Sequence, residues 1–243
     1  GQSIVTAAIE DNTLTITAIQ DLNGTDTIEV TATDAEFSVT HTFTLTVNPV
    51  NDAPEANHAE TDTLEDQAVA FDVLVEGHVS DIDGDDLSLT AASITSGDMG
   101  EGADATVAGT TITYTPSPNY NGETVVSYTV SDGALTDTGT ITITVTPVND
   151  APVLDPNLIT ADTIEEDDDN GDGNTTLILA ATDVDSTDLT FAIIQVAGDV
   201  NADEDTVTLI DGNTITYNPS LNYNGDTVID YTVSDGALTD TGT

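Results

Sequence analysis

Apolar and polar residues alternate along much of the chain with a period of two. Residues 141–145 read ITITV, so the Ile and Val side chains face one side and the Thr side chains the other. Residues 42–47 (TFTLTV) and 111–115 (TITYT) alternate in the same way. Turn signals such as NG, DG and PSP separate these runs, and the 3.6-residue period of an amphipathic helix is absent from the sequence. The pattern predicts short strands of antiparallel sheets.

The alternating runs belong to a longer repeat. Two sequence blocks recur. One contains YTVSDGALTDTGT in its later copies, and the other contains TITY and NYNG in its later copies and shortens to TITAIQDLNG in the first. Copies of the first block lie at residues 27–52, 125–150 and 228–243. Copies of the second block lie at residues 15–24, 111–122 and 214–225. The period of about 100 residues is that of a domain and exceeds the roughly 20–50 residues of solenoid units.

The repeat divides the chain into three parts. Nothing before Gly1 matches residues 53–95, so residues 1–50 are expected to be the C-terminal part of a first repeat. Residues 51–148 read as a complete repeat and residues 149–243 as a third repeat lacking its last strand, which suggests an excerpt from a longer tandem array. About seven strands in about 100 residues favour an all-β fold of tandem antiparallel β-sandwich domains, immunoglobulin- or cadherin-like, arranged as an elongated rod.

Two kinds of turn can be placed within the repeat. Ser131-Asp132-Gly133 reads as a hairpin loop before the strand that starts near Gly139. Tyr120 and Tyr223 come just before the penultimate strand of their repeats. They are expected either to be corner tyrosines that hydrogen-bond back to the chain or to be core aromatics beside the Asn-Gly turn.

The charge excludes several classes of function. The 243 residues include 46 Asp and Glu, three His, and no Lys, Arg or Cys, for a formal net charge of −46. Nucleic-acid binding, docking on anionic lipid and Arg- or Lys-based phosphate binding all require the cations that are missing. Thiol chemistry and disulfides are excluded as well. No apolar run is long enough to insert into a membrane in this segment.

Many of the acidic residues are concentrated in loops that recur between copies. Neighbouring carboxylates repel one another, and without Lys or Arg their counter-charge must come from solution. Hard oxygen ligands suit Ca²⁺, whereas Zn²⁺ is disfavoured by the lack of Cys and the scattered His. The clusters are Asp81, Asp83, Asp85 and Asp86; Asp183, Asp185 and Asp188; Glu65 and Asp66; Glu165 to Asp169; the VNDAP junctions at 50–54 and 148–152; and the hairpin residues Asp34, Asp132 and Asp235.

The ordered motifs carry a family resemblance. VNDAP, a Glu-Asp pair about a dozen residues later, DIDGDDL, YTP…NYNG and YTVSDG follow one another over nearly the whole chain. This series resembles the bacterial cadherin-like, or tandem-95, immunoglobulin-like repeats of large surface adhesins, including the type I-secreted RTX adhesins that take part in biofilms. The resemblance implies Ca²⁺ at the junctions between successive domains.

The resemblance also implies a ligand set for each junction. In cadherin-like domains the ligands are an upstream Glu, an Asn-Asp in the linker, a downstream Asp-x-Asp and an Asp after the penultimate strand. The junction of the second and third repeats would use Glu65, Asn149, Asp150, Asp183, Asp185 and Asp235. The junction of the first and second would use Asn51, Asp52, Asp81, Asp83 and Asp132, with no upstream Glu identified. Pro147 and Ala151 replace an Asp and an Asn of the animal cadherin linker, so one or two ions per junction are expected.

A local insertion in the third repeat is a separate candidate. Asp168, Asn170 and Asp172 match the first half of an EF-hand loop, but Leu179 stands at the position of its final Glu. No flanking helices are predicted, so an EF-hand is not expected. A flexible acidic loop and a stand-alone Asp-loop site for Ca²⁺ are the two remaining interpretations.

The sequence thus favours a non-enzymatic structural role. We expect extender repeats of a bacterial cell-surface or secreted adhesin, whose partners are calcium ions and neighbouring repeats, with host or cell-surface ligands bound by other domains. A carbohydrate- or protein-binding adhesion module and a haloadaptive acidic spacer without specific ions are the alternatives. Catalysis is not expected, because the His residues lack a Ser partner and the Asp-rich loops recur once per repeat.

Overall fold

The computed structural model describes residues 2–155, 164, 175–199, 207–220 and 222–243. All regular elements in this part of the chain are β-strands. The chain divides into two compact units, Gly1–Pro147 and Val148–Thr243, each with its own buried core. Within the described ranges, no helix is long and apolar enough to cross a membrane.

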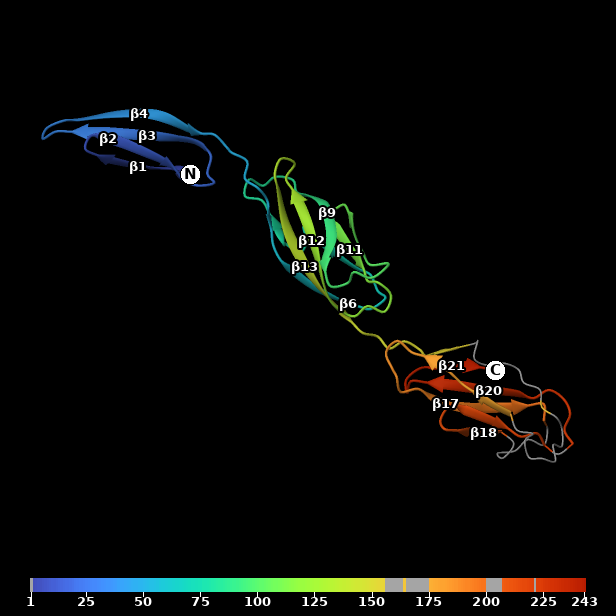
Figure 1. The fold of residues 1–243 in the computed structure, drawn as a ribbon. Helices are drawn as coiled ribbons and strands as arrows, with labels where there is room; N and C mark the ends of the chain where they lie inside the picture. The colour runs from blue at the N-terminus through green and yellow to red at the C-terminus, as the bar shows by residue number, and fades with distance from the viewer. Residues whose placement is uncertain (1, 156–163, 165–174, 200–206, 221) are drawn as a thin grey trace. The chain divides into compact units, whose positions relative to one another are not determined.

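Residues 2–50 form two antiparallel β-hairpins (Figure 1). The alternation of the sequence determines which side chains turn inward. Ile28 is buried and its cross-strand partner Phe43 half-buried, whereas Phe37 and Val39 at the turn of the second hairpin are exposed. The four strands are β1 (Val5–Glu10), β2 (Thr13–Ala18), β3 (Gly24–Thr33) and β4 (Ser38–Val47).

Residues 51–147 form a β-sandwich. Its larger sheet has the strand order β6-β13-β12-β9 and its smaller sheet the order β10-β11-β7, with β5 and β8 forming a further short pair. Figure 1 shows β12 lying between β9 and β13, as this order requires. The strands are β5 (Glu55–Ala56), β6 (Ala59–Leu64), β7 (Val69–Asp72), β8 (Val79–Ser80), β9 (Ser88–Ser96), β10 (Asp104–Ala108), β11 (Thr111–Thr115), β12 (Gly122–Ser131) and β13 (Thr136–Thr146).

One strand pair departs from the predicted antiparallel arrangement. The first strand of the larger sheet, β6, pairs with the last strand, β13, in parallel, from Ala59 opposite Ile141 to Leu64 opposite Thr146. The two sheets together contain seven strands. When successive strands run in opposite directions, the first and seventh run in the same direction, so neighbours in the sheet must be parallel.

The core of this sandwich consists of the inward residues that the alternation predicted. Val126 and Tyr128 on β12 and Ile141 and Ile143 on β13 are 0–2% exposed. Fully burying an aliphatic side chain of this kind contributes about 1.5–3 kcal/mol. The ring of Tyr128 lies over Gly139, its cross-strand partner, where any Cβ atom would collide with the ring. This close approach explains the glycine in the middle of β13.

Residues 148–243 repeat this arrangement within their own unit. The sheets have the orders β15-β19-β18, β17-β20-β21 and β14-β16. Leu179, Ile215, Tyr231 and Val233 lie in the core, and Tyr231 packs over Gly242 as Tyr128 packs over Gly139. The strands are β14 (Val153–Leu154), β15 (Thr175–Ile178), β16 (Ala181–Thr182), β17 (Thr190–Ala197), β18 (Val207–Ile210), β19 (Thr214–Tyr217), β20 (Val228–Ser234) and β21 (Thr239–Gly242).

The two tyrosines before the penultimate strands do not hydrogen-bond backward. The hydroxyl group of Tyr120 donates to the carbonyl of Glu123 at 2.9 Å, and that of Tyr223 donates to the carbonyl of Asp226 at 2.7 Å. Each bond reaches three residues forward, across the Asn-Gly turn. The corner-tyrosine prediction is therefore wrong. Both residues lie beside the Asn-Gly turn, as the alternative predicted, but they are half-buried rather than core residues, and Tyr120 packs against the core.

The sandwich of residues 51–147 also buries an acidic residue, Asp98, which is 1% exposed. Its Oδ2 accepts hydrogen bonds from Tyr114 Oη at 2.9 Å and the Ser117 amide at 2.7 Å. Its Oδ1 accepts from Ser117 Oγ at 2.6 Å and the Gly100 amide at 3.0 Å. Burial alone raises the pKa of Asp98, but these bonds outweigh burial and hold the pKa below its usual value.

We expect Asp98→Asn to destabilise this unit by about 1–3 kcal/mol, because an amide places N–H donors against groups that already donate. Glu101→Gln, at an exposed position of the same loop region, is the control and should have little effect. Denaturant unfolding measures both. The lowered pKa of Asp98 adds a pH signature, because its stabilisation is complete above the ordinary Asp range and is lost as pH falls through the folded pKa. Equal stabilities of the two variants would contradict the role of Asp98.

Candidate metal centre

The loop that follows β8 is organised by one carboxylate. Asp81 Oδ1 accepts hydrogen bonds from the amides of Asp83, Gly84 and Asp85 at 2.8, 3.1 and 3.4 Å. Gly84 adopts a φ of 78°, which a residue with a Cβ rarely takes. The turn brings one carboxylate oxygen each from Asp81, Asp83 and Asp85 within 4.8 Å of one another.

The segment before β5 is attached to this loop and to the β12–β13 turn. The Asp52 amide donates to Asp83 Oδ2 at 2.8 Å, and Asn51 Nδ2 donates to Asp132 Oδ2 at 2.8 Å. Asp132 Oδ1 is held by two backbone amides of its own turn. The five residues predicted for the first ligand set, Asn51, Asp52, Asp81, Asp83 and Asp132, therefore form one hydrogen-bonded group within the first unit.

The second unit contains the same arrangement. Asp183 Oδ1 accepts from the Asp185 amide at 2.8 Å, and Asp185 Oδ2 accepts from the Asp150 amide at 2.7 Å. Asn149 Nδ2 donates to Asp235 Oδ2 at 2.6 Å. The five predicted ligands of this unit are again gathered at one place. These three contacts match their counterparts in the first unit atom for atom, so the arrangement recurs with the repeat.

The remaining oxygens fit a hard cation. Asp81 Oδ2 and Asp183 Oδ2 are both buried and have no protein hydrogen-bond partner among the described residues. Burying a carboxylate oxygen without a partner is costly unless a cation compensates. Ca²⁺ binds oxygen at 2.3–2.6 Å, so ligands on opposite sides of one ion lie about 5 Å apart. The spacing of Asp81, Asp83 and Asp85 agrees with this geometry.

The loop carboxylates differ in their electrostatic environment. Desolvation and the negative charges of Asp21, Asp83 and Asp81 raise the pKa of Asp52. Desolvation and the charge of Asp81 similarly raise the pKa of Asp85. Raised pKa values mark places where negative charge lacks compensation, and a bound cation would lower both.

The turn residues of the same group have the opposite shift. Hydrogen bonds from the Leu135 and Ala134 amides and from Asn51 lower the pKa of Asp132. Hydrogen bonds from Asn149 and two backbone amides lower the pKa of Asp235. Both carboxylates are therefore held in the charged form that cation binding requires.

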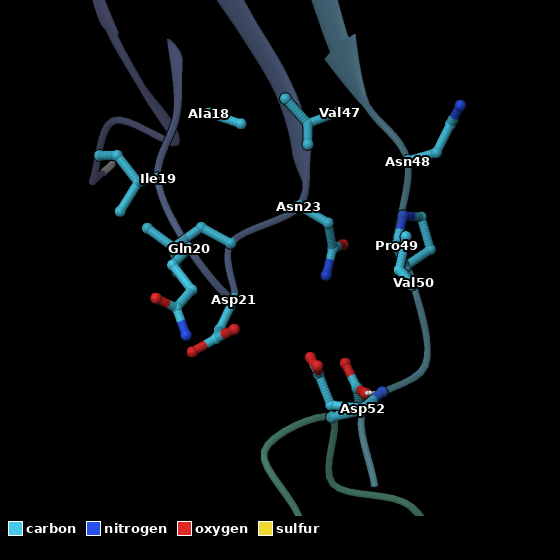
Figure 2. A pocket seen from close by; sticks show the side chains of 12 residues that line it. Ala18, Ile19, Gln20, Asp21, Asn23, Val47, Asn48, Pro49, Val50 and Asp52 are labelled. Carbon is cyan, nitrogen blue, oxygen red and sulfur yellow. Dashed lines mark hydrogen bonds between the residues drawn. The ribbon is translucent and has the colours of Figure 1, made fainter. Parts of the chain in front are cut away.

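A pocket of about 260 Å³ in the first unit adds a residue that the sequence did not indicate. Its walls include residues 18–23, residues 47–50 and the carboxylates of Asp52 and Asp83. In Figure 2 the side chain of Asp21 lies on the side of the pocket that faces Asp52. The volume is below the roughly 300–1,000 Å³ of sites for drug-sized ligands, and the carboxylates suit a hydrated cation better than an organic molecule.

A weak sequence signal for Asp21 existed. In the aligned TITY…NG blocks Asp21 occupies the place of Asn119 and Asn222, and all three have a φ of 58°. An Asp at a position held by Asn in the other copies marks an added charge. Asp85 is part of the DIDGDDL motif. Only the geometry of the turn shows that its carboxylate lies close to those of Asp81 and Asp83.

Glu65 belongs to the first unit, whereas the other predicted ligands of its set belong to the second. It is 3% exposed, which is unusual for a Glu side chain. Its Oε2 accepts a hydrogen bond from Asn121 Nδ2 at 3.4 Å, and its amide donates to the Thr146 carbonyl at 2.9 Å. Glu65 is thus held in place at the end of β6. Its assignment as a calcium ligand stays a prediction, as do those of the other predicted ligands. The Asp168–Asp172 loop and the Glu165–Asp169 cluster lie outside the described residues.

Comparison with known proteins gives the class of the domains. Residues 51–144 match the family model of the bacterial Ig domain, and residues 148–243 match the model of the cadherin-like domain. These two segments are therefore similar to a bacterial Ig domain and to a cadherin-like domain, in agreement with the repeats that the sequence predicted. Such domains are generally non-catalytic, are typical of surface or extracellular proteins and serve in adhesion or as extenders. Cadherin-like domains generally bind Ca²⁺.

Solved structures resemble the chain at low identity. Mouse protocadherin-24 EC1-3 is 12% identical with a TM-score of 0.48, over 99% of this chain and 84% of that one. Human protocadherin-24 EC1-2 is 14% identical with a TM-score of 0.43, over 80% and 94%. An endo-fucoidan hydrolase, MfFcnA4, is 19% identical with a TM-score of 0.31, and the match spans only 36% of that enzyme. No match was found among curated proteins.

We expect Asp21→Asn to lower the pKa of Asp52, because one of the charges that raise it is removed. Asp11→Asn is the matched control, since Asp11 also has a positive φ in a turn but does not line the pocket. Carboxyl chemical shifts followed by NMR during a pH titration measure the change. A group with a raised folded pKa destabilises the ionised protein as pH rises, so Asp21→Asn should also slightly stabilise the ion-free protein at neutral pH. An unchanged pKa of Asp52 would show that Asp21 does not act on it.

Proposed function

We propose that this chain consists of extender repeats of a bacterial cell-surface or secreted adhesin, stiffened by Ca²⁺ at the Asp-rich loops between repeats. The division into residues 1–50, 51–148 and 149–243 is part of this proposal. One observation carries it. Both units repeat the same hydrogen-bonded group of linker Asn-Asp, Asp-x-Asp loop and hairpin Asp, with a buried Asp oxygen that no donor of the described residues satisfies.

The mechanism is electrostatic. Without a cation the carboxylates of each group repel one another, and the repulsion is about 1 kcal/mol per pair at 4 Å in water and several times more near a protein surface. Ca²⁺ replaces this repulsion with attraction. Asn51 and Asp52 precede the sandwich, so an ion that binds them together with Asp81 and Asp83 restrains the linker against the domain that follows.

The expected affinity is that of an extracellular module, with a Kd of about 10⁻⁴–10⁻³ M. At a free concentration of 100 times Kd, binding stabilises a folded unit by about 2.7 kcal/mol per site. This is a substantial fraction of the roughly 5–15 kcal/mol that stabilises a typical domain. Calcium therefore acts on both the linker and the fold.

The first test removes charge without disturbing the loops. Asp81→Asn with Asp83→Asn in the first unit, and Asp183→Asn with Asp185→Asn in the second, keep an oxygen acceptor for the loop amides. We expect each double variant to abolish the calcium-induced rise in Tm of the unit that carries it. Calorimetry should also show that this unit has lost most of its calcium binding. Glu10→Gln with Glu29→Gln removes the same charge from exposed strand positions and should leave both unchanged.

The Tm of each variant is measured in EDTA and in millimolar Ca²⁺ at fixed high NaCl. Full stabilisation by NaCl alone, with no further effect of Ca²⁺, would identify an acidic spacer without specific ions. Equal calcium effects in the loop variants and the control variant would exclude the assigned ligands.

The second test addresses stiffening. Because the chain has no Cys, pairs of spin labels can be attached at Ala108→Cys and Ala237→Cys without competing thiols. We expect the distribution of label distances in electron spin resonance to narrow when Ca²⁺ replaces EDTA, and Asp183→Asn with Asp185→Asn to prevent the narrowing. Binding of Ca²⁺ with an unchanged distribution would leave a stabilising ion site but contradict the extender mechanism.

A further inference from the structure

The segment that leads into β5 is held at two points by the β12–β13 hairpin. Asn51 Nδ2 donates to Asp132 Oδ2 at 2.8 Å, and the Ala56 amide donates to Asp137 Oδ2 at 2.9 Å. Asp132 lies in the turn of the hairpin, and Asp137 lies on β13. Asn51 and Ala56 are as far apart in the sequence as Asp132 and Asp137, so the segment and the hairpin match at both anchors.

The second unit has the same two anchors. Asn149 Nδ2 donates to Asp235 Oδ2 at 2.6 Å, and the Leu154 amide donates to Asp240 Oδ2 at 3.1 Å. The separation in sequence is again the same on both sides. The second anchor, from Asp137 or Asp240 to a backbone amide, therefore recurs with the repeat.

The second anchor fixes the segment beside the metal centre. Between the two anchors, the Asp52 amide is held by Asp83, and Pro54 is buried with a φ that its ring restricts. Beyond them, Ala56 pairs with β8, and β8 leads directly into Asp81. The whole path from the predicted ligand pair to the strand before the Asp81 loop is thus restrained.

Restraint of this kind affects how tightly an ion binds. A loose segment loses conformational freedom when an ion orders it, which weakens binding, whereas a segment that is already fixed has little to lose. We propose that Asp137 and Asp240 are positioning residues for calcium. Each fixes the Asn-Asp segment of its unit through a backbone amide and so sets the affinity of the site without touching the ion. This inference rests on the proposed function and adds the residue that adjusts it.

The first copy of the repeat carries a natural replacement. The alignment of the copies places Asp34 at the position of Asp132 but Val39 at the position of Asp137. Val39 is 71% exposed, and its side chain cannot accept a hydrogen bond. A repeat with valine at this position keeps the Asp of the first anchor and loses that of the second. The residue at this position therefore grades the calcium affinity from one repeat to the next.

The affinity test transfers the valine to the first unit. We expect Asp137→Val to weaken calcium binding about ten-fold, as the loss of one hydrogen bond would. Asp137→Asn keeps an oxygen acceptor for the Ala56 amide and should stay within about three-fold of the unmodified chain. Calorimetry measures both in the full chain, with the second site removed by Asp183→Asn and Asp185→Asn. Thr138→Val, at an exposed neighbouring position of β13, is the control and should have no effect.

Amide hydrogen exchange in EDTA tests the positioning without any ion. The amides of Asp52 and Ala56 should be protected in the unmodified chain. Asp137→Val should speed exchange at both about ten-fold, whereas the amide of Val126 in the core should keep its protection, because only the segment is released. Asp137→Asn should keep the slow exchange.

Several outcomes would overturn the proposal. Unchanged exchange at Asp52 in Asp137→Val is one, and faster exchange without weaker calcium binding is another. Equal losses of affinity in Asp137→Val and Asp137→Asn would show that charge acts on the ion rather than the bond to the amide. If Asp137→Val fails to fold, Asp240→Val and Asp240→Asn decide the question in the second unit. An unmodified chain that binds no calcium would contradict the proposed function instead, and the exchange in EDTA distinguishes that result from a failure of the positioning.

Discussion

Every carboxylate in this chain has to be accommodated without a lysine or arginine. The 46 acidic residues face at most three histidines, so ion pairs contribute almost nothing to the fold. In the described residues the carboxylates are instead satisfied by backbone amides and hydroxyl groups, as at Asp34, Asp72, Asp98 and Asp132. The loops and turns of the molecule are built around this requirement.

The requirement has different outcomes in the core and at the loops. Asp98 is buried, and four donors complete its coordination, so a negative charge is stable inside the sandwich. In the Asp81 loop the backbone satisfies Oδ1 of Asp81, whereas Oδ2 is buried and has no partner within the part of the chain that the structure describes. The Asp183 loop repeats this imbalance. These loops are the places where an external cation contributes most.

The topology of the sandwich connects these loops to the path of the chain. With seven strands, the polypeptide enters at one end of the ladder and leaves at the other. The entering segment passes the Asp81 loop and the β12–β13 turn, which is why Asn51 and Asp52 contact Asp132 and Asp83. The same odd number of strands makes β6 and β13 parallel. One topological feature thus underlies both the proposed metal centre and the pairing of the first and last strands.

Local chemistry allowed the sequence to determine the strands, the repeat, the inward side chains and the residues of the acidic group. Period-two alternation placed Ile141 and Ile143 in a core, and repeated Asp-x-Asp and Asn-Asp motifs marked residues that the structure does bring together. Only the tertiary structure decided the rest. Ile28 and Phe43 follow the same alternation as Val126 and Ile141 but are less buried, because two hairpins cover less surface than a sandwich. The parallel pairing of β6, the burial of Asp98 and the position of Asp21 beside Asp52 depend on contacts between distant segments, which no local pattern encodes.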